Sequence, residues 1–214
     1  MRIGLLGGSF NPIHNAHLRI AEAARIACRL DRVVFIPAAD PPHKALAGDL
    51  PFAMRCRMVA LAISDYAPFE LSTIEGERSG KSYSIDTIRA FRAQSAQDEL
   101  FFIIGGDSFI EIGLWHSYEA IFRECSLIVV ERPGYEIVDQ HAVLPPAIKG
   151  EFSCDDESRR LTHTSGHYVY FVQGTPQDIS STEIRRLLAA GNSITPLVPP
   201  AVAAYISQQR IYYE

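Results

Sequence analysis

Short apolar segments alternate with longer amphipathic segments along the chain. Runs of apolar and β-branched residues predict strands at Ile3–Leu6, Val33–Ile36, Phe69–Ser72, Leu100–Ile104, Leu127–Val130 and Tyr168–Val172. Helical periodicity covers about His17–Leu30, Met54–Ile63 and Ile85–Ala93. A last helix begins near Pro199-Pro200 and ends at about Gln209, since proline suits a first helical turn.

Apolar strands separated by helices are typical of a parallel sheet that is covered on both faces. Because the crossovers between parallel strands are right-handed, the pattern predicts an α/β, Rossmann-like doubly wound, mostly parallel sheet with helices on both faces. The segment Gly134–His167 interrupts the alternation, since it is polar and contains Pro145-Pro146 and the acidic cluster Asp155–Glu157. It predicts a peripheral insertion or a mobile loop.

The length of 214 residues suits a single domain with an inserted segment. We expect residues 1–178 to form the core, with a variable insertion at about 134–167, and residues 179–214 to form a small C-terminal helical region. Hydrophobic residues make up 47% and charged residues 21%, which is ordinary for a globular protein with a core. The net charge of −5 argues against a nucleic-acid partner, because nucleic-acid-binding domains are usually basic.

No apolar run approaches the roughly 18 residues of a membrane span, and the first apolar stretch is too short for a signal peptide. We therefore expect a cytoplasmic protein without a membrane partner, and the sequence leaves a homo-oligomer open. The four cysteines are scattered without a CxxC pair: Cys28, Cys56, Cys125 and Cys154. This spacing predicts reduced, mostly buried thiols rather than disulfides or a metal site.

The first candidate site is a glycine-rich turn followed by two histidines. Gly7 and Gly8 come directly after the first strand, where glycine lets the backbone turn sharply and approach a phosphate closely. The dinucleotide GxGxxG pattern and the Walker Gly-Lys-Ser/Thr pattern are both absent. His14 and His17 share one face of a helical turn, where two imidazoles can donate N–H groups to phosphoryl oxygens. Capping or solvated histidines are the alternative, which the preceding strand and turn disfavour.

The second candidate site is a helix start with two arginines. Ser180 and Glu183 fit a capping box, so this helix begins near Ser181. Arg185 and Arg186 then fall in or just after the first turn, where the helix dipole is already positive. A bound polyphosphate would resolve the conflict, with further donors from the hydroxyls and amides at the helix start. The alternative is a capped helix with solvated arginines.

Together the two motifs resemble the HxGH and SSTxxR signatures of a nucleotidyltransferase superfamily. More narrowly, the chain resembles the bacterial nicotinate-nucleotide adenylyltransferase family over nearly its whole length. The other segments that carry the resemblance are Pro41–Lys44, Arg55–Met58, Ser82–Thr87, Ile103–Asp107, Trp115, Arg132–Tyr135 and Ile179–Arg185. Three positions depart from the family pattern: Ala16 replaces a glycine, Ser84 replaces a threonine, and His116 follows Trp115 where an aromatic residue is common.

The resemblance implies adenylyl transfer from ATP to nicotinate mononucleotide, which gives deamido-NAD and pyrophosphate in NAD biosynthesis. Mg²⁺ would be bound mainly through the ATP phosphates, and the protein itself would hold no metal. A phosphate monoester has a second pKa of about 6 and is largely dianionic at neutral pH, so no general base is needed. Such an enzyme aligns two anions and stabilises charge on the α-phosphoryl oxygens.

The resemblance also implies roles for individual residues. His14, His17 and Arg185 would be catalytic. The residues that bind ATP or phosphate would be Gly7, Gly8, Ser9, Phe10, Lys44, Gly105, Asp107, Ser181 and Thr182, and His43 could assist Lys44. Those that bind nicotinate mononucleotide would be Ser82, Ser84, Thr87, Trp115 and Arg132, although Arg132 could instead border the adenine.

Three of these roles have a physical argument of their own. Asp107 follows Gly105-Gly106 at a strand end, where a carboxylate suits a ribose diol, or else caps a helix. Trp115 could stack on the pyridine ring or belong to the core. The helix start within Ser82–Thr87 offers amides that favour a carboxylate, which supports nicotinate over nicotinamide.

Several alternatives remain at this point. The same chemistry could act on nicotinamide mononucleotide or on another phosphorylated acceptor such as phosphopantetheine, and a cytidylyltransferase is a further alternative. A catalytically silent nucleotide sensor on the same fold is the alternative from another class, although both histidines and Arg185 are present. An NAD-dependent oxidoreductase would lack its usual glycine fingerprint here.

Overall fold

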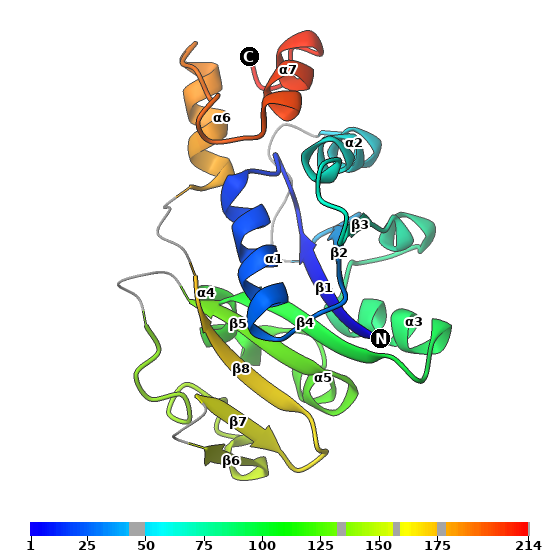
Figure 1. Cartoon of the computed structure of the whole chain (residues 1–214), viewed down its shortest axis with the longest axis vertical. Coiled ribbons are helices and arrows are strands. Elements are labelled where there is room, and N and C mark those ends of the chain that lie inside the picture. The colour runs from blue at the N-terminus through cyan, green and yellow to red at the C-terminus, as the bar shows by residue number, and fades with distance from the viewer. Residues whose placement is uncertain (43–49, 132–135, 156–158, 175–178, 214) are drawn as a thin grey trace. The chain divides into compact units, whose positions relative to one another are not determined.

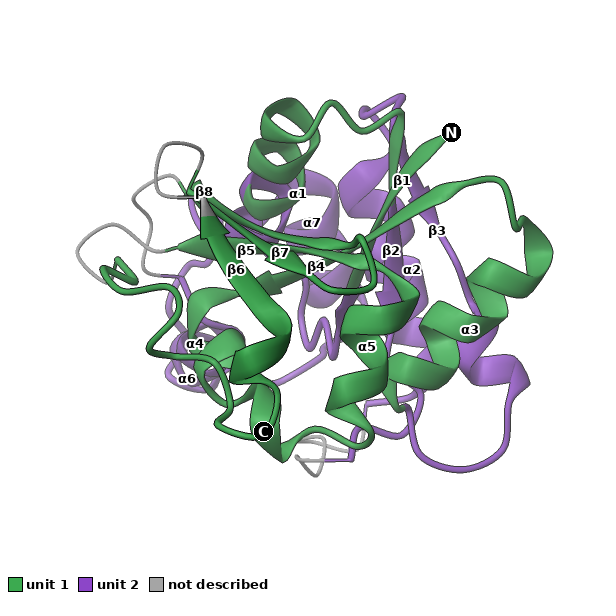
Figure 2. Cartoon of the chain, turned by 90° about the horizontal axis from the view of Figure 1, so that it is seen from below, with its two compact units in different colours: residues 1–6, 20–33, 83–176 green, residues 7–19, 34–82, 177–214 purple. Residues whose placement is uncertain are grey.

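The computed structural model of the chain describes residues 1–42, 50–131, 136–155, 159–174 and 179–213 (Figure 1). The chain divides into two compact units that alternate along the sequence (Figure 2). Unit 1 comprises Met1–Leu6, Ile20–Val33 and Tyr83–Pro176, and unit 2 comprises Gly7–Arg19, Val34–Ser82 and Gln177–Glu214. The strands form an eight-stranded sheet in the order β3-β2-β1-β4-β5-β8-β7-β6.

Parallel strands form the centre of unit 1. They belong to β1 (Arg2–Gly8), β4 (Glu99–Gly105), β5 (Ser126–Glu131) and β8 (Tyr168–Gln173). Ile3 pairs with Leu100, and further along Ile103 pairs with Ile128. Every residue of β5 is buried, as expected for a central strand with both faces covered. The predicted Rossmann-like, mostly parallel α/β sheet is therefore confirmed.

An antiparallel hairpin borders this parallel part of unit 1. Strand β6 (Phe152–Asp155) pairs with β7 (Arg160–His163), which pairs with β8. Gly134–His167 was predicted as a peripheral insertion or a mobile loop, and the part of it that forms β6 and β7 is paired strand rather than loop. Strand β7 buries alternate residues, Leu161 and His163, so its sequence keeps the polar character that suggested a loop.

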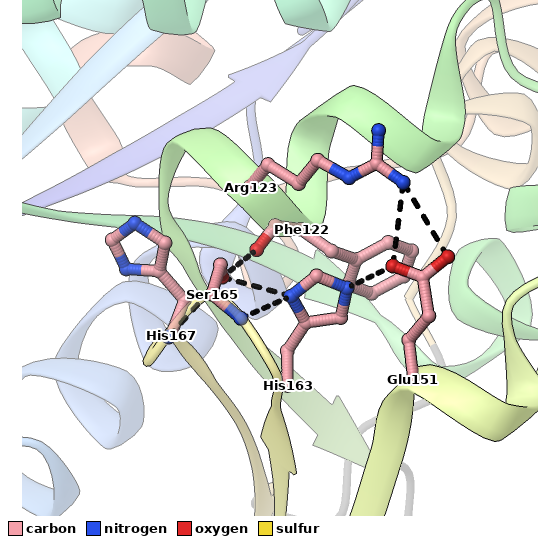
Figure 3. Close-up of polar contacts among 6 residues, drawn as sticks. All are labelled: Phe122, Arg123, Glu151, His163, Ser165 and His167. Carbon is pink, nitrogen blue, oxygen red and sulfur yellow. Dashed lines mark hydrogen bonds and ion pairs between the residues drawn. The ribbon is translucent and has the colours of Figure 1, made fainter.

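Polar contacts fasten the turn after β7 to neighbouring segments (Figure 3). The Nε2 atom of the buried His163 lies 3.1 Å from Glu151 Oε2, and its Nδ1 atom lies 2.8 Å from Ser165 Oγ. The Ser165 hydroxyl donates to the carbonyl of Phe122 at 3.0 Å, and Arg123 pairs with Glu151 at 3.3 Å. The Ser165 N–H also donates to Nδ1 at 3.1 Å. These contacts stabilise the hairpin.

The helices that lie wholly in unit 1 include α3 (Ser84–Gln94), α4 (Gly106–Ile110) and α5 (Tyr118–Glu124), with the short 3₁₀ helices η3 (Ile112–Leu114) and η4 (Lys149–Glu151). Helices α3 and α5 pack against each other. Helix α3 buries Ile85, Ile88 and Phe91, which recur at the spacing of one helix face. Its predicted bounds, Ile85–Ala93, differ from the observed ones by one residue at each end.

Unit 2 combines a small part of the sheet with helices from both ends of the chain. Its elements are β3 (Phe69–Leu71), the greater part of β2 (Arg32–Pro37), α2 (Phe52–Ile63), η2 (Ile74–Glu77), α6 (Ser181–Ala189) and α7 (Pro200–Gln208). Helix α1 (Asn15–Ala27) begins in unit 2 and continues into unit 1. Helices α2 and α7 pack against each other, and each contributes fully buried residues such as Met58 and Ile206.

The prediction that most of the thiols are buried is confirmed among the described residues. Cys28, Cys56 and Cys125 are free and buried, and Cys154 is exposed. Burial raises the pKa of Cys28 to about 11 and that of Cys125 to about 12, so both stay protonated. In the part of the chain that the structure describes, no helix is both long enough and apolar enough to cross a membrane.

Candidate active site

The loop after β1 departs from the predicted glycine turn. Gly7 and Gly8 belong to the strand, and the Gly8 carbonyl accepts a hydrogen bond from the Ala38 amide at 2.8 Å. The left-handed conformation falls instead on Phe10, with a φ of 44°. A Cβ atom on Gly8 would lie 3.1 Å from the Phe10 ring, so this glycine permits close packing of the ring rather than forming the turn.

The Phe10 side chain is buried beneath this loop, with 1% of its surface exposed. Its ring meets the ring of His17 edge to face, with centroids 5.0 Å apart, and tilts against Phe35 at 5.9 Å. A non-glycine residue in the left-handed region is strained and persists only where its surroundings hold it. The aromatic packing supplies part of that restraint.

His14 and His17 lie side by side, as the spacing predicts. Their rings stack with centroids 3.7 Å apart and planes inclined by 27°. The His14 amide donates to Nδ1 of His17 at 3.2 Å. Burial and the neighbouring His14 ring hold the pKa of His17 well below its usual value, so the ring is neutral at neutral pH. Since Nδ1 is an acceptor, the ring proton is on Nε2.

Helix α6 contacts the loop that contains His14 and leads into α1, the helix that carries His17. Ser181 Oγ donates to the Pro12 carbonyl at 2.9 Å, and Arg185 Nη1 donates to the Asn11 carbonyl at 2.7 Å. Arg185 Nη2 also donates to Thr182 Oγ1 at 3.2 Å. The two sequence motifs, about 170 residues apart, therefore form one cluster within unit 2.

The two arginines of α6 have different surroundings. Arg186 pairs with Glu183 at 2.7 Å, and both side chains are largely exposed, so a carboxylate already balances this cation. The predicted cap is confirmed, because Ser180 Oγ accepts the Glu183 amide at 3.1 Å. Arg186 therefore matches the alternative of a solvated arginine, whereas the half-buried Arg185 is turned toward the loop.

Two further residues contact the loop and were missed from the sequence. The guanidinium of Arg55, on α2, donates from Nη1 to the Ser9 carbonyl at 2.8 Å and has no exposed surface. The hydroxyl of Tyr212 donates to Asn11 Oδ1. A signal existed for Arg55, since it lies three and four positions before Met58 and Val59 on the buried face of its helix. No comparable pattern indicates Tyr212.

Ser82 braces the segment that follows β2. Its hydroxyl accepts the amides of Ala39 and Asp40, each at 3.0 Å, and its own amide donates to the Asp40 carbonyl at 2.9 Å. Lys81 adds an ion pair to Asp40 at 2.8 Å. Ser82 thus shapes the chain just before Pro41–Lys44, while His43 and Lys44 themselves lie outside the described residues.

The start of α3 in unit 1 carries the other hydroxyls of the predicted acceptor site. Ser84 is the first helical residue and is half-buried, and Tyr83 before it makes no side-chain cap. Thr87 is 1% exposed and its hydroxyl lies 3.5 Å from the Tyr83 carbonyl, so any contact it makes with a ligand would be indirect. His116 stacks on the Tyr83 ring, with the ring centroids 4.2 Å apart. The position where an aromatic residue is common in the family therefore still holds a planar ring.

The carboxyl end of β4 leads directly into α4. Gly105 occupies the N-cap position and Asp107 lies in the first turn with its side chain exposed, so Asp107 is not the cap. Trp115 follows η3, is half-buried, and meets Phe102 edge to face at 6.2 Å. It is therefore not a fully buried core residue. Arg132 lies outside the described residues.

The replacement of the family glycine by Ala16 is compatible with the backbone. Ala16 is the second residue of α1 and has ordinary helical conformation. A positive φ, which would have made alanine unfavourable, is not required there. The methyl group therefore does not distort the turn between His14 and His17.

Comparisons with known proteins agree with the resemblance. The cytidylyltransferase-like family matches residues 5–187. The probable nicotinate-nucleotide adenylyltransferase of Pelobacter propionicus is 62% identical over 214 residues, which is 100% of this chain and 99% of that protein. Its counterpart in Geobacter metallireducens is 56% identical over 212 residues, covering 99% and 98% of the two chains.

A solved structure of Plasmodium falciparum nicotinic acid mononucleotide adenylyltransferase, complexed with NaAD, matches with a TM-score of 0.76. The match covers 99% of this chain and 97% of that one at 20% identity, so it shows the fold. The full-length identity to the bacterial relatives is what shows the family. The chain belongs to the nicotinate-nucleotide adenylyltransferase family, within the cytidylyltransferase-like nucleotidyltransferases.

Proposed function

We propose that this chain transfers the adenylyl group of ATP to nicotinate mononucleotide and releases pyrophosphate. The relatives that match it along their whole length carry the name of this activity. The observation that carries the proposal is the cluster in unit 2, where Arg185 and Ser181 bond the loop that presents the stacked His14 and His17. This cluster places cationic and neutral N–H donors around one loop, as a polyphosphate requires.

His17 acts in this mechanism as a neutral donor. Its Nε2–H would bond an oxygen of the α-phosphoryl group as the acceptor phosphate attacks and pyrophosphate departs. A preorganised donor stabilises the charge that develops on these oxygens without having to reorganise. His14 stacks on His17 and holds its Nδ1 through the backbone amide, so it fixes the orientation of the ring as well as offering its own imidazole.

Arg185, Ser181 and Thr182 are assigned to the leaving pyrophosphate. Two of the five N–H groups of Arg185 bond Asn11 and Thr182, and a guanidinium can offer the others to β- and γ-phosphate oxygens. The first amides of α6 would add donors with the favourable sign of the helix dipole. Gly7, Gly8, Ser9 and Phe10 would border the phosphates through their backbone, and Lys44 would approach them from its own segment.

Mg²⁺ would bind together with the nucleotide. Magnesium is usually held by substrate phosphates and a few carboxylates and keeps several of its waters. Among the described residues, no group of three His, Cys, Asp or Glu side chains is arranged to hold a metal ion. We therefore write the substrate as the Mg²⁺ complex of ATP, in which the metal screens the phosphate charge.

The acceptor is assigned to residues of α3 and of the segments after β4. The start of α3 at Ser84 offers backbone amides without a side-chain cap, which suits the carboxylate of nicotinate. Trp115 would stack on the pyridine ring, and Asp107, two residues after Gly105, would bond a ribose diol. Ser82 would contribute by bracing the segment before Pro41–Lys44. Arg132 keeps its predicted role at the acceptor.

The test is pyrophosphate release from ATP and Mg²⁺ with nicotinate mononucleotide and nicotinamide mononucleotide compared in parallel. Preference for nicotinate supports both the chemistry and the acceptor. Preference for nicotinamide would keep adenylyl transfer and overturn the assignment of the α3 start. Binding of ATP without release, whichever mononucleotide is present, would favour the silent sensor.

A further inference from the structure

Arg55 is a charged side chain in an apolar setting. It has no exposed surface, and its Cζ atom lies 5.5 Å from the centre of the Phe52 ring. Among the described residues, Nη1 bonds the Ser9 carbonyl, while Nε and Nη2 have no hydrogen-bond partner. Burying a cation with unsatisfied donors is costly, and an apolar residue of similar size would avoid the cost. An apolar residue could not form the bond to the Ser9 carbonyl, so this bond is the feature that would account for a buried arginine here.

The peptide that follows Ser9 gives that explanation. A trans peptide is planar, so its C=O and N–H groups point in opposite directions. When Arg55 holds the Ser9 carbonyl on one side, the N–H of Phe10 must point to the other side. Phe10 has a φ of 44°, a strained conformation that would relax if this peptide could rotate. A charge-assisted hydrogen bond is strong enough to resist that rotation.

The same arrangement recurs further along the loop. Arg185 holds the Asn11 carbonyl, and Ser181 holds the Pro12 carbonyl, which directs the N–H of Ile13 to the opposite side. Three carbonyl groups of the loop are thus bonded by side chains of α2 and α6. Because Pro12 has no N–H, the bonds to the Ser9 and Pro12 carbonyls are the two that set the direction of a backbone N–H, those of Phe10 and Ile13.

We propose that Arg55 is a positioning residue for nucleotide binding: by holding the Ser9 carbonyl, it aims the backbone N–H of Phe10 at a phosphate of ATP. The inference rests on the proposed function and goes beyond it, because Arg55 has no surface with which to touch the substrate. Its effect on the nucleotide passes through one peptide group, and its guanidinium does not itself contact the phosphates.

The test compares Arg55→Met with Arg57→Met. Both substitutions remove one positive charge from α2, but Arg57 is exposed and Arg55 is buried. Steady-state rates are measured with ATP and nicotinate mononucleotide, and thermal unfolding verifies that each variant is folded. We expect Arg55→Met to lower kcat about 10- to 100-fold, because a misaligned group far from the reacting atoms costs up to about 100-fold. Arg57→Met should match the wild type.

A spectroscopic readout separates positioning from general destabilisation. The ¹⁵N–¹H signal of Phe10 is followed during titration with the non-hydrolysable analogue α,β-methylene-ATP. In the wild type this signal should shift strongly. In Arg55→Met it should no longer shift, while Arg55→Lys, which can still donate to Ser9, should recover part of both the shift and kcat.

The outcomes distinguish the two proposals. If the wild type makes no dinucleotide but the Phe10 amide responds to the analogue, the proposed function fails and the inference about Arg55 stands. If a folded Arg55→Met variant keeps the rates of Arg57→Met and the Phe10 shift, the inference is wrong. Should Arg55→Met not fold, an unresponsive Phe10 amide in the wild type would overturn the inference by itself.

Discussion

The backbone amide of His14 donates to Nδ1 of His17 at 3.2 Å, and the two rings stack 3.7 Å apart. Spacing alone predicts that the two imidazoles share a face, but this bond also sets their chemistry. It makes Nδ1 an acceptor and places the proton of a neutral ring on Nε2. His17 is therefore a fixed hydrogen-bond donor at neutral pH and not a proton shuttle.

The first prediction concerns the titration of His17. Its pKa is lowered by burial and by the neighbouring His14 ring, so it should lie below the ordinary value of about 6.5. In the folded protein the ring stays neutral at a pH where the unfolded chain binds a proton. The free energy of unfolding therefore falls as the pH drops below about 6.5, and this loss stops growing once the pH is below the folded pKa. Imidazole ¹⁵N and ¹³C signals measure the folded pKa directly, and a value at or above 6.5 would contradict the neutral-donor mechanism.

The second prediction concerns Tyr212, whose hydroxyl bonds the side chain of the buried Asn11. Burial raises the pKa of Tyr212, so the hydroxyl stays protonated and donates. Removing a hydrogen bond to a buried acceptor costs about 1–3 kcal/mol. Tyr212→Phe should therefore lower the free energy of unfolding in urea by about that amount and reduce kcat. Tyr213→Phe is the matched control, because Tyr213 is exposed; equal effects of the two substitutions would show that the Asn11 contact has no special role.

The third prediction concerns Glu151, which contacts His163 of the β6–β7 hairpin (Figure 3). Arg123 and, to a smaller extent, His163 lower the pKa of Glu151 below its usual value. A carboxylate whose pKa is lowered on folding stabilises the protein above its unfolded pKa, and the stabilisation is lost as the pH falls through the folded value. Glu151→Gln should lower the melting temperature at pH 7. At about pH 3–4 the melting temperatures of the variant and the wild type should lie closer together. A difference that is the same at both pH values would rule out the carboxylate as the cause.

The sequence pattern predicts the parallel strands and the longer helices because these elements are long and apolar. Helices α4 and α5 went unpredicted, since five and seven residues are too few for a 3.6-residue period to stand out. Strands β6 and β7 are polar on alternate residues, as strands near a sheet edge usually are. Their sequence pattern therefore favours a loop over a strand.

The candidate site likewise contains residues that the sequence predicts and residues that only the structure reveals. His14, His17 and Arg185 follow from motif spacing, and the structure places them in one cluster. The strained residue Phe10 could not be predicted, because the pair Gly7-Gly8, one residue further back along the chain than Ser9, offers a more obvious place for a turn. The contact of Arg55 with Ser9 joins residues 46 positions apart, and only the packing of α2 against the loop reveals it.

The most direct test of the account is the single-turnover rate of dinucleotide formation by wild type and His17→Ala at saturating ATP, Mg²⁺ and nicotinate mononucleotide. His141→Ala, in unit 1, is the matched control, because its ring contacts the Lys149 carbonyl at 3.2 Å and is assigned no part in the reaction. Loss of a preorganised donor to the transition state costs about 10²- to 10³-fold. The account predicts a decrease of that size for His17→Ala and an unchanged rate for His141→Ala. A folded His17→Ala variant with the wild-type rate would contradict the claim that this histidine cluster carries out adenylyl transfer.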